Sequence, residues 1–203
     1  MKDILVSILR QHDVTPAQYR EATEKLGAIL AYEAAQILGR KKIDVQTPLE
    51  KTEGSDLIND VVLVPVLRSG LALLPPFLHL FENAKIGLIG LKRNEQTAIP
   101  NEYYQNLPKI DPNEDVIVLE PMIATGGSAA KALNILREHG VRDEKLVLVS
   151  VIASPEGLKF VQTAVPKLRI VLAQLDRGLN AQKFILPGLG DFGDRYFRTE
   201  YNH

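Results

Sequence analysis

The sequence predicts an α/β fold in which helices cover both faces of a mostly parallel sheet. Short runs of almost wholly apolar residues, such as residues 61–67 and 146–152, recur through the middle of the chain. Segments of helical length separate these runs. Strands that are buried on both faces are continuously apolar, and their alternation with helices is typical of a parallel sheet.

The first helix with a clear start signal begins near Thr15. Thr15 can cap the helix, Pro16 suits its first position, and Gln18 can reach back to complete a capping box. Apolar residues then recur at helical spacing, which predicts a helix to about residue 38. Residues 42–47 are expected to form a short strand on one edge of the sheet.

The interior of the chain alternates between strands and helices. We expect strands at residues 61–67, 86–91, 116–119, 146–152 and 170–175. We expect helices at residues 70–81, 129–139 and 155–163. Together these elements predict one domain over residues 1–203, with a helical segment at about 1–40, a core at about 60–175 and a tail at about 176–203.

Two segments break this alternation and are candidates for function. Residues 93–113 are polar and long for a connection, which is typical of a lid, a binding loop or a disordered segment. Here we expect a flexible loop or hairpin over the site. Residues 184–194 contain three glycines and a proline without any periodicity.

Composition narrows the class of protein. The net charge is −1 and there is no long basic run, so we expect no general binding to nucleic acid. Cysteine is absent, which excludes disulfides and thiolate metal sites. The apolar runs are too short to span a membrane, and the first ten residues do not resemble a signal peptide. We therefore expect a soluble, cytoplasmic protein.

The strongest local signal is the turn after the apolar strand at residues 116–119. A turn of small residues that opens a helix directs backbone N–H groups and the helix dipole at one point, which favours an anion. Thr125 and Ser128 add hydroxyl donors, and Gly126 and Gly127 allow close approach. Short glycine motifs often have only a structural role, and a tight strand-to-helix connection remains an alternative.

The acid at the end of this strand points to a sugar phosphate. Glu120 lies where a carboxylate would meet the hydroxyls of a ribose whose 5-phosphate sits in the turn. This arrangement resembles the motif with which type I phosphoribosyltransferases bind 5-phosphoribosyl 1-diphosphate (PRPP). The motif covers residues 120–128, namely Glu120, Pro121, Met122, Ile123, Ala124, Thr125, Gly126, Gly127 and Ser128.

The resemblance extends over nearly the whole chain and narrows to the uracil phosphoribosyltransferase family. Besides residues 120–128, it rests on residues 66–70 (VLRSG), 93–95 (RNE) and 185–195 (ILPGLGDFGDR). The last block is the most discriminating, because other type I members recognise their bases with unrelated segments. The resemblance implies the type I fold and the salvage reaction in which uracil and PRPP give UMP and diphosphate.

The resemblance also assigns roles to residues. It implies that Arg68, Arg93 and Asp191 are catalytic, and that all three bind PRPP together with residues 120–128. It implies that Ile185, Gly190, Asp191 and Phe192 contact uracil. Without the resemblance, the simpler interpretation of Arg68 would be a surface ion pair. The simpler interpretation of Asp191 would be that it forms a turn.

Cofactors and partners follow from the same resemblance. We expect Mg²⁺ bound mainly through PRPP, with no metal site made by the protein alone. We expect a homodimer or a higher homo-oligomer, with GTP as a possible effector. His139, at the end of a helix, is expected to cap it rather than to act as an acid or base.

Three residues depart from the usual pattern of the family. Glu120 replaces aspartate, Phe192 stands where alanine is usual, and Phe184 replaces tyrosine. We expect Phe192 to lie beside the base, where its bulk covers the base or narrows the pocket. Two alternatives therefore stay open, a catalytically weak paralogue and a regulatory protein on this fold that binds nucleotide and RNA.

Overall fold

The computed structural model of the chain describes residues 1–93 and 100–199, and of Arg93 the backbone alone. Its centre is a sheet whose main path is β10-β9-β7-β3-β5-β6. These strands are β3 (Val61–Leu67), β5 (Leu88–Arg93), β6 (Pro100–Asn106), β7 (Asp115–Leu119), β9 (Leu146–Ala153) and β10 (Arg169–Leu175). Two short strands, β4 (Lys85–Ile86) and β8 (Met122–Ile123), pair with β3 and β9.

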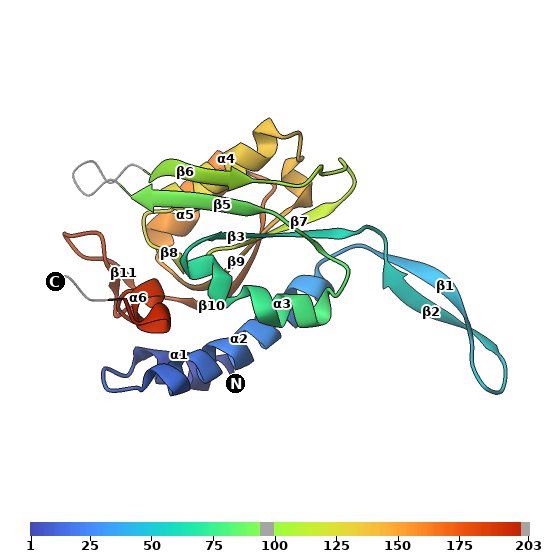
Figure 1. Ribbon diagram of the computed structural model, residues 1–203, viewed down its shortest axis with the longest axis horizontal. Helices are drawn as coiled ribbons and strands as arrows, with labels where there is room; N and C mark the ends of the chain where they lie inside the picture. Colours follow the sequence, from blue (N-terminus) through green and yellow to red (C-terminus); the bar gives the residue numbers. More distant parts are fainter. Residues whose placement is uncertain (94–99, 200–203) are drawn as a thin grey trace.

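All pairings in this sheet are parallel except that of β5 with β6. The helices are α1 (Lys2–Arg10), α2 (Pro16–Gln36), α3 (Leu74–Leu80), α4 (Gly127–Glu138), α5 (Pro155–Ala164) and α6 (Phe192–Phe197). Figure 1 shows α1, α2 and α3 on one side of the sheet and α4 and α5 on the other. The predicted α/β class is confirmed.

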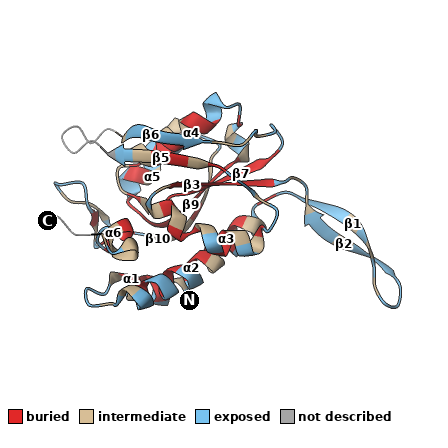
Figure 2. Cartoon of the chain, viewed as in Figure 1, coloured by how far each residue is buried: buried red, intermediate tan, exposed pale blue. Residues whose placement is uncertain are grey.

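Successive residues of each central strand pack into the two separate cores. In β3, Leu63 belongs to the core beneath α1–α3, whereas Val62 and Val64 belong to the core beneath α4 and α5. Because side chains alternate across a strand, a strand covered on both faces must be apolar at every position. The buried strands therefore run through the middle of the molecule between exposed outer helix faces (Figure 2).

The predicted start of the first long helix is confirmed in detail. The Thr15 hydroxyl accepts from the Gln18 backbone N–H, and the Gln18 side chain accepts from the Thr15 backbone N–H. The helix expected at residues 70–81 is instead a 3₁₀ turn at Ser69–Ala72 followed by α3. Pro75 and Pro76 lie in the first turn of α3, where their missing N–H groups cost no hydrogen bond.

The strand expected at residues 42–47 exists, but its expected place on the sheet edge is wrong. It is β1 (Arg40–Gln46), which pairs in antiparallel fashion with β2 (Lys51–Leu57) in a separate two-stranded sheet. This hairpin projects from the body of the molecule (Figure 1). Both strands are mostly exposed, and Leu49 at the hairpin turn is 95% exposed.

The long polar segment after β5 contains a strand. Residues 100–106 form β6, which returns along β5 as an antiparallel partner. The described part of this segment therefore fits the hairpin alternative. Residues 94–99 lie outside the described residues.

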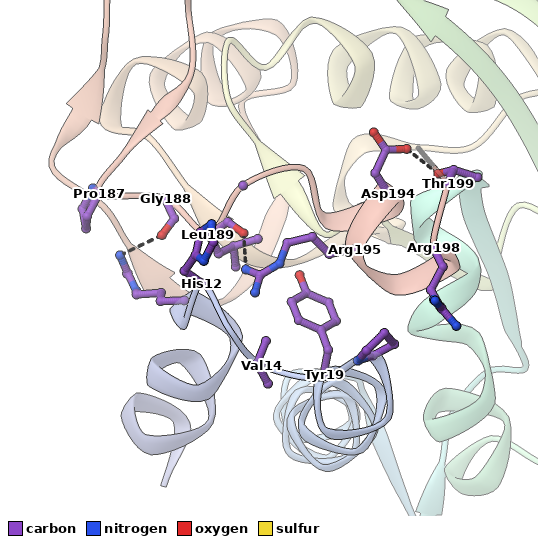
Figure 3. Close-up of a pocket in the computed structure, with 13 residues that line it drawn as sticks. His12, Val14, Tyr19, Pro187, Gly188, Leu189, Asp194, Arg195, Arg198 and Thr199 are labelled. Atoms are coloured by element: carbon purple, nitrogen blue, oxygen red, sulfur yellow. Dashed lines mark hydrogen bonds between the residues drawn. The ribbon is translucent and has the colours of Figure 1, made fainter. Parts of the chain in front are cut away.

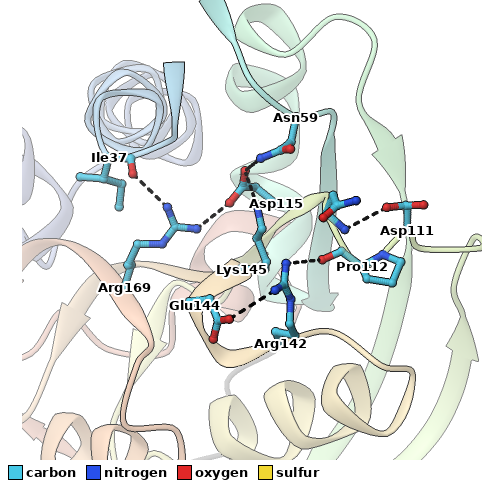
Figure 4. A network of polar contacts seen from close by, with 10 residues as sticks. Ile37, Asn59, Asp111, Pro112, Asp115, Arg142, Glu144, Lys145 and Arg169 are labelled. Atoms are coloured by element: carbon cyan, nitrogen blue, oxygen red, sulfur yellow. Dashed lines mark hydrogen bonds and ion pairs between the residues drawn. The ribbon is translucent and has the colours of Figure 1, made fainter. Parts of the chain in front are cut away.

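A buried ion network stabilises the amino-terminal edge of the sheet. Asp115, at the start of β7, is 3% exposed, and its carboxylate lies 2.7 Å from Arg169 Nη2 and 3.7 Å from Lys145 Nζ. It also accepts a hydrogen bond from Asn59 Nδ2 at 3.0 Å. Figure 4 shows these side chains converging from β7, from β10 and from the connections that precede β3 and β9. A buried carboxylate with several partners is paired rather than reactive, and it lies at the edge opposite to the cleft described below.

None of the helices in residues 1–93 and 100–199 has the length and apolar character needed to cross a membrane.

Candidate functional site

A cleft of about 700 Å³ opens at the carboxyl edge of the parallel strands. Arg68 follows β3, Glu120 follows β7, and Lys92 lies at the end of β5. Open α/β sheets bind their ligands at this edge. The residues that line the cleft are Val66, Leu67, Arg68, Ser69, Leu91, Lys92, Tyr103, Glu120, Ser128, Asp191, Gly193 and Asp194.

The glycine turn before α4 has the backbone geometry of an anion-binding loop. Gly126 is the N-cap of α4 with φ +81°, a left-handed conformation that favours glycine. No side chain of the described residues caps this helix. The N–H groups of the first turn therefore stay available, and Ser128 lines the cleft beside them.

The start of α5 holds this turn in place from behind. The Ser154 hydroxyl donates to the Ala124 carbonyl at 2.6 Å and accepts from the Gly157 N–H at 2.9 Å. A Cβ at Gly126 would lie 2.6 Å from the Gly157 carbonyl oxygen. A Cβ at Gly157 would lie 2.3 Å from the Ala124 carbonyl oxygen. Glycine is thus required on both sides of this contact, which fixes the shape of the turn.

Glu120 is buried at the end of β7 and has an unusual pKa. Burial raises the pKa of its carboxyl from the ordinary 4.5 to about 8, against a hydrogen bond from the Met122 backbone N–H that lowers it. In the free protein the carboxyl is therefore largely neutral at pH 7. A neutral carboxyl both donates and accepts, which suits a pair of hydroxyl groups. Perturbed carboxyls in clefts are candidates for functional groups.

Arg68 projects into the cleft directly after β3. The Leu67–Arg68 peptide bond is cis. The Arg68 side chain is 59% exposed, and its Nη2 lies 3.6 Å from the Asp194 carboxylate. An ion pair with an acid, the simpler reading from sequence, is therefore present. It lies inside the cleft, where the guanidinium is open to a ligand.

The carboxyl-terminal tail brings Asp191 to the same cleft. Asp191 caps α6, since its carboxylate accepts from the Asp194 N–H at 2.8 Å. Asp191 is exposed, and it lines the cleft together with Gly193 and Asp194. The turn-forming role and a role in the cleft are therefore compatible. Asp191 and Asp194 thus lie in the same cleft as Glu120, although they are far from it in the sequence.

The expectation that the Phe192 side chain lies beside the base is wrong. Phe192 is 1% exposed and packs edge-on against Tyr19 at 5.5 Å and in a stack with Tyr196 at 6.2 Å, measured between ring centroids. The apolar contacts with α2 and α6 draw the ring into the core. Only the backbone of Phe192 lies between the cleft residues Asp191 and Gly193.

Of the residues expected to contact uracil, Asp191 lines the cleft, whereas Ile185 and Gly190 do not. Ile185, in β12 (Ile185–Leu186), pairs with β11 (Gly178–Leu179), and its side chain is buried in the core. Gly190 lines another cavity, of whose lining residues only Asp194 also lines the cleft. A contact from either residue to a base in the cleft would therefore have to come from the backbone or after a movement of the tail.

Of the other residues expected to bind PRPP, Arg93 has no described side chain. Within residues 120–128, Glu120 and Ser128 line the cleft, and the residues between them connect β7 to α4 without being among the lining residues. Lys92, at the end of β5, also lines the cleft. Tyr103 also lines the cleft and was missed, because no motif or spacing marks a tyrosine in this polar segment; its 56% exposure is seen only in the structure.

His139 is confirmed as a cap. It is the C-cap residue of α4, and its Nδ1 lies 2.9 Å from the Ile135 carbonyl oxygen. In the part of the chain that the structure describes, no group of three or more His, Asp or Glu side chains could hold a metal ion.

Comparisons with known proteins agree in sequence and in structure. The sequence model of the family described as uracil phosphoribosyltransferase matches residues 2–199. The uracil phosphoribosyltransferase of Thermosipho africanus is 46% identical over 96% of this chain and 93% of its own length. That of Finegoldia magna is 42% identical, with the same coverage of both chains.

Two solved structures resemble the structure of this chain in fold. A protein of Aquifex aeolicus superposes with a TM-score of 0.89 at 34% identity, covering 98% of this chain and 95% of its own. A hypoxanthine-guanine phosphoribosyltransferase of Bacillus anthracis gives a TM-score of 0.52 at 13% identity, covering 79% of this chain and 80% of its own. The second likeness shows a shared phosphoribosyltransferase fold.

Proposed function

The chain belongs to the uracil phosphoribosyltransferase family, and we propose that its cleft joins uracil to the ribose 5-phosphate of PRPP, giving UMP and diphosphate in pyrimidine salvage. One observation carries this proposal for the site. The cleft is lined by Glu120 and Ser128 of the phosphate turn, by Arg68 and by Asp191 of the tail. Residues from three distant blocks of the family pattern thus face one space.

On the PRPP side, the 5-phosphate would bind the turn at residues 124–128, whose backbone N–H groups and helix dipole favour an anion. Glu120 would then meet the ribose hydroxyls, because it lies at the strand end before the turn. Arg68 would bind the pyrophosphate, for which a planar and permanently charged guanidinium is well suited. By family resemblance Arg93, the last residue of β5, would also contact PRPP. The rest of residues 120–128 would contact PRPP on the same ground.

On the uracil side, the backbone of the tail would read the edge of the base. Uracil alternates acceptor, donor and acceptor along this edge, and backbone groups can match that order if the chain is fixed. The proposed contacts are Ile185, Gly190, Asp191 and Phe192, the last through its backbone because its ring is in the core. Cytosine carries an amino group in place of O4, which would leave a backbone donor unpaired.

The proposed mechanism needs no nucleophilic side chain. The bond from ribose C1 to pyrophosphate loosens first and breaks as pyrophosphate leaves. Uracil N1 forms the new bond to C1 of the oxocarbenium-like ring from the opposite face, and the N1 proton passes to solvent water. Catalysis then comes from positioning and electrostatics. Arg68 offsets the charge that grows on the departing pyrophosphate, and the Asp191 carboxylate faces the region where positive charge develops on the ribose.

Magnesium would enter the cleft with PRPP. The donor set of the described residues fits this, because the cleft offers the scattered carboxylates of Asp191 and Asp194 rather than a closed ligand cage. Mg²⁺ prefers phosphate oxygens and water in such sites, and it would neutralise part of the pyrophosphate charge. Asp191 is the proposed partner through a water molecule.

We also propose that the protein is one domain, that it is cytoplasmic, and that it forms a homodimer or a higher homo-oligomer. The assembly is proposed by family resemblance. Light scattering after size exclusion tests the assembly. GTP is proposed as an effector by family resemblance, and rates with and without GTP test it.

Turnover with radiolabelled uracil tests the reaction. The protein should convert uracil to UMP in the presence of PRPP and Mg²⁺, and each UMP should be matched by one diphosphate. Absence of UMP at saturating PRPP would overturn the proposed function. Omitting PRPP provides the control for a contaminating activity that uses another donor.

A further inference from the structure

The end of helix α1 is bonded to the tail that the proposed function assigns to uracil. Arg10, the last residue of α1, forms a bidentate ion pair with Asp176, through Nη2 at 2.5 Å and Nη1 at 3.3 Å. Arg10 Nη1 also donates to the Gly188 carbonyl at 3.3 Å, and Asp176 accepts from the Gly188 N–H at 2.9 Å. Both backbone polar groups of Gly188 are thus held by one ion pair.

A second arginine makes a parallel connection from α6. Arg195 Nη1 donates to the Leu189 carbonyl at 2.6 Å and to the Leu9 carbonyl at 2.5 Å, and Nη2 donates to the Gln11 carbonyl. Its guanidinium lies over the Tyr19 ring, 4.7 Å from the centroid. Figure 3 shows Arg195 between Leu189 and Tyr19, beside a cavity of about 770 Å³.

The backbone that these arginines hold has little regular structure of its own. Gly188 and Gly190 have φ of +67° and +77°, and β12 ends at Leu186. Glycines in this region are conformationally permissive, so the path of residues 187–190 depends on contacts from outside. The next residue, Asp191, lines the cleft. A base that is read by backbone groups requires that backbone to be fixed in advance.

We infer that Arg10, with Asp176, and Arg195 are positioning residues for uracil, so that the end of α1 helps to set the affinity for the base. This inference rests on the proposed function and adds residues that lie outside the cleft. Arg10 and Arg195 line the cavity behind the tail, whereas Arg68 and Glu120 line the cleft for PRPP. The two arginines should therefore affect the uracil side of the reaction and leave the PRPP side intact.

A purely structural role makes a different prediction. The Asp176 side chain is 1% exposed, so loss of Arg10 leaves a buried charge and lowers stability in either case. A loss of folded protein lowers the apparent kcat and leaves both KM values unchanged. A displaced tail raises the KM for uracil alone. The ratio of the two KM values thus separates the roles.

The experiment measures UMP formation by the full chain for four proteins: wild type, Arg10→Met, Arg10→Lys and Lys2→Met. Lys2→Met is the matched control, because Lys2 lies on the same helix but bonds to Glu33 and to the Leu172 carbonyl, away from the tail. Arg10→Met should raise the uracil KM by at least about tenfold, as expected for lost hydrogen bonds to a charged group. Its PRPP KM, and both KM values of Lys2→Met, should stay at the wild-type level.

Arg10→Lys should fall between wild type and Arg10→Met, because lysine keeps the charge but not the two-pronged geometry. If Arg10→Met does not fold, Asp176→Asn takes its place, and its uracil KM should rise in the same way. An unchanged uracil KM in the folded variants, or an equal rise in both KM values, overturns the inference. Absence of UMP with the wild type overturns the proposed function instead, so the two failures are distinguishable.

Discussion

The guanidinium of Arg68, directly after β3, lies 3.6 Å from the carboxylate of Asp194 in the carboxyl-terminal tail. The contact joins the residue proposed for pyrophosphate to the segment proposed for uracil. The side chains are 59% and 27% exposed, so the pair contributes less than about 1 kcal/mol to stability. A pyrophosphate can therefore replace Asp194 as the partner of the guanidinium at little cost in free energy.

Replacing Arg68 should weaken PRPP binding. Arg68→Ala is expected to raise the KM for PRPP by roughly 10- to 100-fold, because a hydrogen bond to a charged group contributes about 1.5–3 kcal/mol. The uracil KM should change much less. Steady-state kinetics with each substrate varied in turn measures both. Arg137→Ala is the control, since Arg137 pairs with Asp143 at the end of α4, outside the cleft, and should leave kinetics unchanged. Equal PRPP KM values for Arg68→Ala and wild type would remove Arg68 from the site.

Two glycines with similar backbone angles should respond differently to alanine. Gly126 (φ +81°) has the Gly157 carbonyl oxygen 2.6 Å from the position of an added Cβ, whereas Gly140 (φ +85°) has nothing within 4 Å. Gly140→Ala should cost about 1 kcal/mol of stability through backbone strain alone and leave the kinetics unchanged. Gly126→Ala should cost more and raise the PRPP KM, because the phosphate turn must shift. Denaturant unfolding and kinetics on both variants test this, and matching behaviour of the two would contradict the account of the turn.

Glu120 should make the free protein less stable as the pH rises. Its folded pKa of about 8 exceeds the ordinary 4.5, so the unfolded chain releases the proton first. Stability is unaffected below about pH 4.5 and falls between pH 4.5 and 8, where the unfolded chain has released the proton and the folded chain still holds it. Glu120→Gln cannot ionise, so its Tm should exceed that of the wild type increasingly over this range. Thermal unfolding from pH 5 to 8.5 without ligand measures the difference, and parallel pH profiles would show that Glu120 is ionised in the free protein.

Phe192→Ala should destabilise the protein without improving turnover. The Phe192 ring is 1% exposed between Tyr19 and Tyr196, and such Phe→Ala changes cost about 3–5 kcal/mol. Because the ring does not enter the cleft, its removal opens no space for the base. Calorimetry and UMP formation on the same preparation test both statements. Higher turnover at unchanged stability would support the weak-paralogue alternative and contradict the position of the ring.

The sequence predicted most reliably what depends on local chemistry. The strand at residues 61–67 coincides with β3, because a strand buried on both faces must be apolar throughout. The start of α2 was readable from Thr15 and Gln18, which form the capping box by themselves. The strand before residues 120–128 and the helix after the glycine turn also follow in the expected order, as β7 and α4.

Prediction from the sequence failed where contacts between residues far apart in the chain determine the structure. Residues 40–57 are polar, so nothing in their pattern distinguishes an edge strand from a free hairpin. The direction of the Phe192 ring depends on Tyr19, which lies far away along the chain. The same holds for Arg195, whose acceptors are the carbonyls of Leu9, Gln11 and Leu189. Backbone carbonyls leave no sequence signature, so this connection required the structure.

The ratio of kcat/KM for uracil to that for cytosine, at saturating PRPP and Mg²⁺, tests the central claim most directly. Sites that hydrogen-bond a substrate group reject an analogue without it strongly, so we expect uracil to be preferred by a factor on the order of 10⁴. UMP should be the product from uracil, with little or no CMP from cytosine. Comparable values for the two bases would contradict a tail that reads uracil, even if the protein used PRPP.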